Sequence, residues 1–133
     1  MAFQFSVAAR NAALDAIETA TGPAPVLTLR SGPVPADCAE ADSGTALATL
    51  TLPADWLLTA AGGAKALSGL WQDLAADATG LAGHFRLSQG GTCHIQGSVT
   101  DTDGGGDMTL DNPSIAAGQR VTVTGFTLTA GGA

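Results

Sequence analysis

The sequence predicts a mainly β protein: an antiparallel β-sandwich, jelly-roll-like, with one N-terminal α-helix, in a single domain over residues 1–133. Three observations favour this fold class. Eighteen glycines and only 13% charged residues are more typical of strands and turns than of a helical bundle. One stretch near the N-terminus has helical periodicity. Short segments with alternating apolar and polar residues follow it, separated by turn residues.

The centre of the predicted sheet is a hairpin over Leu81–Thr100. In its first arm, Phe85 and Arg86 fall on opposite faces, and the second arm alternates in the same way. This period of two predicts half-buried antiparallel strands, with one face toward solvent. The pair Gly90–Gly91 supplies the positive φ angles that a tight hairpin turn requires.

The predicted helix covers Ser6–Ala20, with Ser6 as its N-cap and Gly22 at its end. Leu14 and Ile17 lie on its apolar face. Arg10 lies on or beside that face. Either its stem packs while its head reaches solvent, or it forms an ion pair with a neighbouring subunit.

Further strands are expected at intervals along the chain, with a bulge at Gly125 in the last one. They are Pro25–Ser31, Thr45–Leu52, two short strands around a turn at Gly62–Gly63, Met108–Leu110 and Arg120–Thr129. Leu67–Ala75 could be helix or strand, and Gly69 and Trp71 favour a strand. The predicted core comprises Leu14, Ile17, Leu27, Leu29, Leu50, Trp56, Phe85, Leu87, Ile95, Val99, Val121, Val123, Phe126 and Leu128.

The segment Gly32–Gly44 has no periodicity and is expected to be an exposed acidic loop. It carries Asp37, Glu40 and Asp42 without matching cations nearby, so a basic partner surface would complement it. The whole chain has a net charge of −7 and only five Lys and Arg residues, which argues against nucleic-acid or anionic membrane partners. No apolar run is long enough for a membrane span, and the first twenty residues do not resemble a secretory signal.

Cys38 and Cys93 are expected to be small buried thiols in a reducing compartment, with a disulfide as the alternative. Neither belongs to a C-x-x-C pair, which argues against structural zinc. His84 and His94 are expected to be exposed strand residues rather than metal ligands.

The acidic, glycine-rich stretch Asp101–Asp107 partly matches a calcium loop, but it lacks the final Glu and the flanking helices. A glycine-rich hairpin turn is the competing interpretation, and the one favoured here. The sequence contains no nucleophile elbow and no phosphate-binding loop. We therefore expect no enzymatic activity, no cofactor and no metal.

Several motifs together resemble small structural proteins of tailed bacteriophages and prophages, over nearly the whole chain. The motifs are S-x-A-x-R-N-A-x-L-D-A-I at Ser6–Ile17, L-R-S-G at Leu29–Gly32, S-G-T-x-L-A-T-L-T-L-P at Ser43–Pro53, A-x-G-G-x-K-A-x-S-G at Ala60–Gly69, G-x-F-R-L at Gly83–Leu87 and G-T-C-H-I-Q-G at Gly91–Gly97.

The resemblance implies a non-enzymatic virion protein, assembled in the bacterial host cytoplasm, where thiols stay reduced. The favoured role is a capsid decoration or cement protein that binds the major capsid protein as a homo-oligomer, commonly a trimer. A tail, tail-fibre or head–tail connector component, which would bind a tail protein, is the alternative. A ligand-binding β-sandwich module represents a different class. The expected contact residues are Phe3, Phe5, Arg10, Asp37, Glu40 and Asp42.

Overall fold

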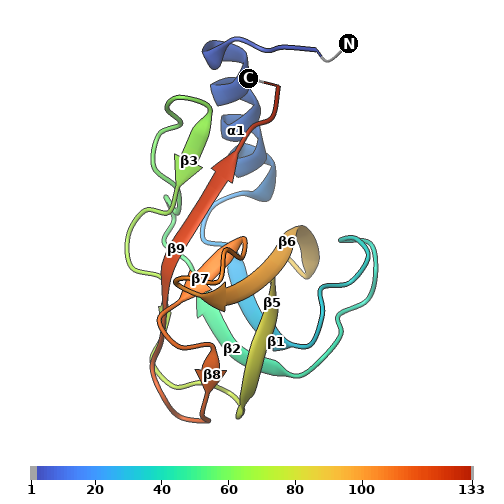
Figure 1. The fold of residues 1–133 in the computed structure, drawn as a ribbon, viewed down its shortest axis with the longest axis vertical. Helices are drawn as coiled ribbons and strands as arrows, with labels where there is room; N and C mark the ends of the chain where they lie inside the picture. The colour runs from blue at the N-terminus through green and yellow to red at the C-terminus, as the bar shows by residue number, and fades with distance from the viewer. Residues whose placement is uncertain (1–2, 133) are drawn as a thin grey trace.

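The computed structural model describes residues 3–132 and contains one helix and nine strands (Figure 1). The elements are α1 (Val7–Thr21), β1 (Val26–Ser31), β2 (Ala46–Thr51), β3 (Ala64–Ala66), β4 (Gln72–Asp73), β5 (Gly80–Gln89), β6 (Thr92–Asp101), β7 (Met108–Leu110), β8 (Ser114–Ile115) and β9 (Val121–Thr129). The prediction of a mainly β protein with one N-terminal helix is confirmed.

The strands join into one curled sheet in the order β2-β1-β5-β6-β7-β9-β3, with β4 added to β9 and β8 added to β5. The pairing is mixed rather than purely antiparallel, because β6 and β7 run parallel. The sheet curls into a half-barrel, and the finer prediction of a jelly-roll-like sandwich is not confirmed. Helix α1 lies at one end, beside β3 and the last part of β9 (Figure 1).

Helix α1 begins and ends where the sequence predicts. The Ser6 hydroxyl accepts a hydrogen bond from the Ala9 N–H at 3.1 Å, and Gly22 ends the helix with a φ of 91°. Leu14 is buried, as expected. Ile17 is 39% exposed, so its assignment to the core is wrong. The helix packs on the short strand β3 and not on the broad part of the sheet, so only a narrow stripe of it is covered.

The predicted central hairpin is confirmed as β5 and β6, with Gly90 and Gly91 at φ angles of 60° and 82°. A bulge is present in β9 as predicted, but its extra residue is Thr124 and not the neighbouring Gly125. Leu110 pairs with Val123 and Thr109 with Gly125, so one β9 residue between them is extra. This shift allows Val123 and Phe126 both to be buried.

Strand β7 follows β6 through a tight turn that reverses the chain twice, and for this reason the two strands are parallel. Added Cβ atoms at Gly104 and Gly106 would lie 2.6 Å and 2.8 Å from the Thr100 side chain, so the turn needs glycine to pack on β6. The predicted glycine-rich turn is therefore confirmed, but it does not form a hairpin.

The core is built around four aromatic rings. Trp71 lies between Trp56 and Phe126, at centroid distances of 6.1 Å and 5.4 Å, and Phe126 meets Phe85 edge-on at 5.6 Å. Eleven of the fourteen predicted core residues are buried, and Ile95 and Leu128 pack against the core while partly exposed. The large apolar residues of the core that the prediction missed are Leu47, Leu52, Leu57, Trp71, Met108, Leu110 and Ile115.

Strand β5 is buried on both faces, which the sequence did not indicate. His84 and Arg86 are 0% and 2% exposed, although they occupy the polar face that was expected to meet solvent. The segment Gly32–Gly44 folds back over this face and supplies polar partners for both side chains.

Candidate interaction surfaces

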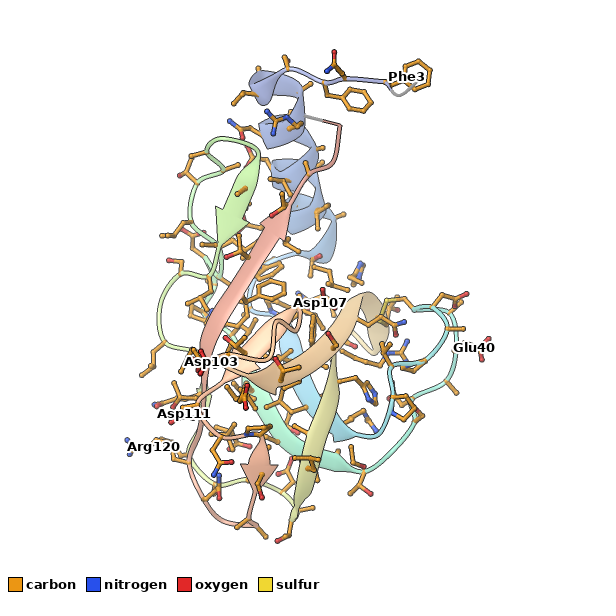
Figure 2. All side chains as sticks on the ribbon, viewed as in Figure 1. Phe3, Glu40, Asp103, Asp107, Asp111 and Arg120 are labelled. Atoms are coloured by element: carbon orange, nitrogen blue, oxygen red, sulfur yellow. A yellow bond between two sulfur atoms is a disulfide. The ribbon has the colours of Figure 1, made fainter. Side chains whose placement is uncertain are left out.

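The segment before α1 places two aromatic side chains in solvent. Phe3 is 86% exposed and Phe5 is 54% exposed. The Phe5 N–H donates to the Gly132 carbonyl at 2.6 Å, and the Phe5 ring lies against Gly132. Figure 2 shows Phe3 at the outer end of this segment, away from the body of the protein. Two of the expected contact residues, Phe3 and Phe5, are therefore exposed, as a contact role requires.

A shallow apolar groove lies beside these aromatic residues, between α1 and the end of β9. We call it the helix-end groove, and its volume is about 460 Å³. It is lined by Phe5, Ala9, Arg10, Ala13, Leu14, Ile17, Thr129, Ala130 and Gly131. Val7 and Ile17 add exposed apolar area at the same helix. A contiguous apolar surface of this kind is typical of an interaction site.

Arg10 is held within the chain. Its Nε–H donates to the Phe5 carbonyl at 3.3 Å, and its guanidinium lies against Gly63, where a Cβ would collide with it. The neighbouring Asn11 accepts the Gly63 N–H at 2.9 Å. Arg10 and Asn11 thus attach the start of α1 to the Gly62–Gly63 turn.

Lys65 on β3 attaches the other end of the helix. Its Nζ lies 2.6 Å from Asp15 Oδ1 and 2.9 Å from Glu18 Oε1, and the side chain is only 4% exposed. Burial lowers the pKa of Lys65, but the hydrogen bonds and charges of the two carboxylates outweigh burial and raise the pKa above its usual value. The ammonium group therefore stays charged and keeps α1 on β3.

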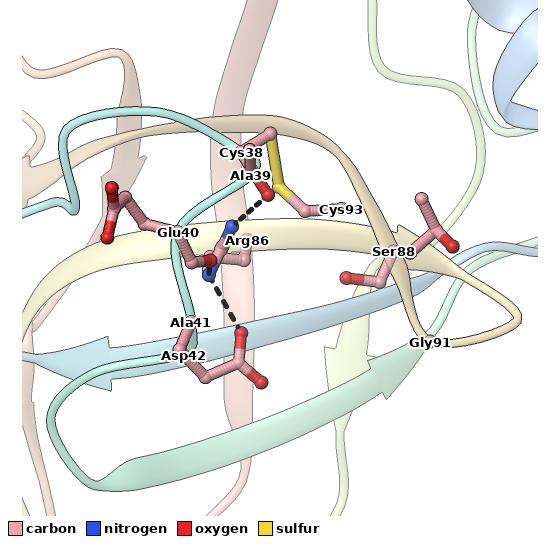
Figure 3. Close-up of a pocket in the computed structure, with 10 residues that line it drawn as sticks. Cys38, Ala39, Glu40, Ala41, Asp42, Arg86, Ser88, Gly91 and Cys93 are labelled. Carbon is pink, nitrogen blue, oxygen red and sulfur yellow. Dashed lines mark hydrogen bonds and ion pairs between the residues drawn. A yellow bond between two sulfur atoms is a disulfide. The ribbon is translucent and has the colours of Figure 1, made fainter.

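The acidic loop is tied to the sheet through Arg86 (Figure 3). Arg86 donates to the carbonyls of Cys38 and Glu40 at 2.8 Å and 2.9 Å, and to Asp42 Oδ1 at 3.0 Å. Arg30 contacts Asp42 Oδ2 at 3.3 Å. The prediction that Asp42 lacks a cation nearby is therefore wrong, because the loop folds onto two arginines of the sheet.

The other acidic residues of the loop differ in their roles. Asp37 Oδ1 accepts the N–H groups of Ala39 and Glu40 at 2.8 Å and 3.2 Å, so it shapes a turn. The Glu40 carboxylate has no hydrogen-bond or ion-pair partner within residues 3–132, and it faces outward (Figure 2). Of the three acidic loop residues predicted to contact a partner, Glu40 is the one that stays available.

Cys38 and Cys93 form a disulfide, with their Cα atoms 5.3 Å apart (Figure 3). The prediction of unpaired thiols is therefore wrong. The two residues are 55 positions apart in the sequence, and only the folding of the loop onto β6 brings them together. A pocket of about 370 Å³ lies beside the disulfide, between the loop and the hairpin, with Arg86 and Ser88 in its lining.

The two histidines lie in different environments in the folded protein. His94 is exposed, as expected, but His84 is buried beneath the loop, and its Nδ1 lies 2.9 Å from the Gly32 carbonyl. Gln96 supports the same loop through the Pro35 carbonyl at 2.8 Å. These contacts show that the polar face of β5 anchors the loop.

The stretch Asp101–Asp107 is arranged as a turn in which Asp107 binds the backbone. Asp107 Oδ2 accepts the Ser98 N–H at 2.9 Å, and Thr100 Oγ1 accepts the Gly106 N–H at 2.9 Å. No group of three or more His, Cys, Asp or Glu side chains in the described part of the chain is arranged to hold a metal ion.

Several residues that build these surfaces were not predicted. Lys65, Asn11 and Arg86 give no local signal in the sequence, because their partners lie 44 or more positions away. Ile17 was expected to pack inward, but it is 39% exposed. Compared with models of protein families, curated proteins and solved structures, the chain matches none of them. Among residues 3–132, no helix has the length and apolar character to cross a membrane.

Proposed function

We propose that this protein is a non-enzymatic structural component of a tailed-phage particle, and specifically a capsid decoration protein that binds the major capsid protein. The observation that carries the proposal is the exposure of Phe3 and Phe5 ahead of α1, with Phe5 lining the apolar helix-end groove. The sequence motifs that resemble phage structural proteins supply the context. A tail, tail-fibre or connector component is the alternative within the same particle.

The disulfide fits a protein that acts outside the cell. Disulfides persist in oxidising surroundings, and a particle meets such surroundings once its host has lysed. The bond between Cys38 and Cys93 closes the acidic loop on the sheet and would preserve the fold in the medium. The thiols would then pair after release instead of remaining reduced as in the cytoplasm.

Labelling of purified particles tests the proposal. Antibodies to this chain, viewed by electron microscopy on particles from the phage or lysogen that encodes it, should decorate the shell. Label confined to the tail would support the alternative role, and particles without label would contradict both. A chain without residues 1–5 should fold but be retained poorly on particles, because it lacks both exposed phenylalanines.

A further inference from the structure

The end of β9 has one open edge. Strand β7 pairs with β9 only as far as Phe126, and with β6 only over Val99–Asp101. Beyond these points β6 and β9 separate, and a slot of about 390 Å³ lies between them. We call it the edge slot, and it is lined by Phe85, Ile95, Gln96, Asp107, Phe126, Thr127, Leu128 and Thr129.

The backbone of β9 directs hydrogen-bonding groups toward this opening. The Phe126 carbonyl accepts from Leu67, and the Ala130 N–H donates to Gly63, both on the β3 side. Because the backbone groups of a strand alternate between its two edges, the N–H and C=O of Thr129 point the other way, toward the slot. Within residues 3–132 these two groups have no hydrogen-bond partner. Such an edge can pair with an added extended segment.

The edge slot and the helix-end groove meet at Thr129, which lines both. Arg10 and Asp107 are the only charged residues in the two linings, in a chain with seventeen Asp, Glu, Lys and Arg residues. Apart from these two side chains, an occupant would meet only neutral groups, so most charges on it would lose hydration without gaining a counterion. The surface therefore fits a neutral, extended segment with a large apolar side chain.

The segment Phe3–Gln4 of another copy has this chemistry. It is uncharged and extended, and it carries the most exposed large apolar side chain of the described residues. It does not fill the groove of its own chain, because the bond between Phe5 and Gly132 directs the preceding residues away from the body (Figure 2). The projecting ring and the open groove lie at the same end of the molecule, so two copies can bury both at once.

We propose that Phe3 of one copy inserts into the helix-end groove of a second copy, with the adjoining backbone paired to Thr129 at the open edge of β9. The inference deepens the proposed function, since it names the contact by which the structural protein self-associates. Like-charge repulsion between two chains of charge −7 is smaller where the surface carries few acidic groups, and Asp107 is the only one in the two linings, which favours this end as the site of contact.

Sedimentation of the full-length protein over micromolar to millimolar concentrations tests the contact. The wild-type chain should self-associate. Phe3→Ser should weaken association about ten- to hundredfold, as expected for the loss of one buried phenylalanine side chain. The matched control is Leu81→Ser, which removes a 64% exposed apolar side chain from β5, outside both linings, and should leave association unchanged. Equal weakening by both changes would overturn the inference.

Two further variants locate the contact. Thr129→Pro removes the N–H that points to the slot but keeps the hydrogen bonds to β3, so it should weaken association while the melting temperature stays near that of the wild type. Phe3→Cys mixed with Ala13→Cys should yield a covalent dimer with a short bismaleimide, whereas Phe3→Cys mixed with Ala75→Cys should not. Equal yields from the two mixtures would contradict docking in the groove.

The outcome can be separated from that of the proposed function. A chain that decorates particles but remains monomeric at millimolar concentration would overturn this inference and leave the structural role intact. A chain that self-associates through Phe3 but is missing from particles would overturn the proposed function and leave this inference intact.

Discussion

At the residue scale, the guanidinium of Arg86 is almost fully buried, and its hydrogen bonds explain how the interior accommodates this charge. Two backbone carbonyls of the acidic loop and the carboxylate of Asp42 accept from it. Hydrogen bonds that involve a charged group are roughly twice as strong as neutral ones. Arg86 therefore links the loop to the sheet, which gives it a structural role in this fold.

Replacing Arg86 by Met tests this role. The loop carbonyls would lose their donor, and we expect the free energy of unfolding to fall by about 2–4 kcal/mol, as for loss of charged hydrogen bonds. Urea denaturation at pH 7 measures the difference. The control is Arg120→Met, an exposed arginine without an ion pair in the described chain, which should change stability by less than about 0.5 kcal/mol. Equal losses of unfolding free energy from the two changes would contradict the structural role of Arg86.

Phe85 provides a second test at this scale. Its ring is 1% exposed and meets Phe126 edge-on at the centre of the core. Phe85→Ala should cost about 3–5 kcal/mol, because it removes buried apolar area and leaves a cavity. A loss below about 1 kcal/mol in the same denaturation experiment would show that the ring does not pack as described.

At the element scale, the loop Gly32–Gly44 behaves as a cover for the polar face of β5. The disulfide closes a segment of 55 residues between the loop and β6. A link of this length removes considerable entropy from the unfolded chain, worth about 4 kcal/mol in the loop-closure estimate. The cover is thus held by a covalent bond and by the contacts of Arg86.

The double variant Cys38→Ser, Cys93→Ser should lose about 2–5 kcal/mol of unfolding free energy. Its loop should also become more sensitive to limited proteolysis between residues 33 and 43. Mass spectrometry of the unreduced wild-type protein should give a mass about two units below that of the dithiol form. A wild-type protein that is alkylated at both cysteines without reductant would show that the bond does not form.

The attachment of α1 depends on pH through Lys65. The carboxylates of Asp15 and Glu18 raise the pKa of Lys65 in the folded state. A raised lysine pKa stabilises the fold fully below the usual value of 10.5, and the contribution is lost as the pH rises through the folded-state pKa. The stability difference between wild type and Lys65→Met should therefore stay constant from pH 7 to pH 9 and shrink above about pH 10.5. A difference that does not shrink would contradict the ion pairs.

The elements that the sequence predicts well are those with local causes. The cap at Ser6, the Gly90–Gly91 turn and the bulge in β9 each depend on one or two neighbouring residues, and all three are present, the bulge with Thr124 as its extra residue, next to the predicted Gly125. The burial of Arg86 was not predictable, because an alternating pattern cannot tell solvent from a polar loop that covers the strand. The parallel direction of β7 likewise results from packing of its turn on Thr100.

The candidate site could be predicted only in those parts that depend on neighbouring residues in the sequence. Exposure of Phe3 and Phe5 follows from two aromatics ahead of a capped helix, and the structure confirms it. The groove beside them was not predictable, since it brings α1 next to residues 129–131 at the other end of the chain. The disulfide was missed because 55 residues separate its cysteines and no local motif joins them.

At the scale of the whole molecule, the exposed phenylalanines ahead of α1 and the acidic loop lie in different parts of the fold (Figure 2). The helix end carries the exposed phenylalanines and the helix-end groove, whose only charged lining residue is Arg10, while the acidic loop covers the polar face of β5. A protein arranged in this way can associate through one end and remain hydrated elsewhere. This arrangement suits a component that is used in many copies.

The central claim is that the protein is a stoichiometric part of a phage particle, and its abundance in purified particles tests this most directly. Quantitative mass spectrometry should find the chain in a fixed ratio to the major capsid protein, unchanged by further gradient purification. A decoration role predicts a copy number comparable to that of the capsid subunit. A ratio that falls toward zero with each purification step would contradict the account.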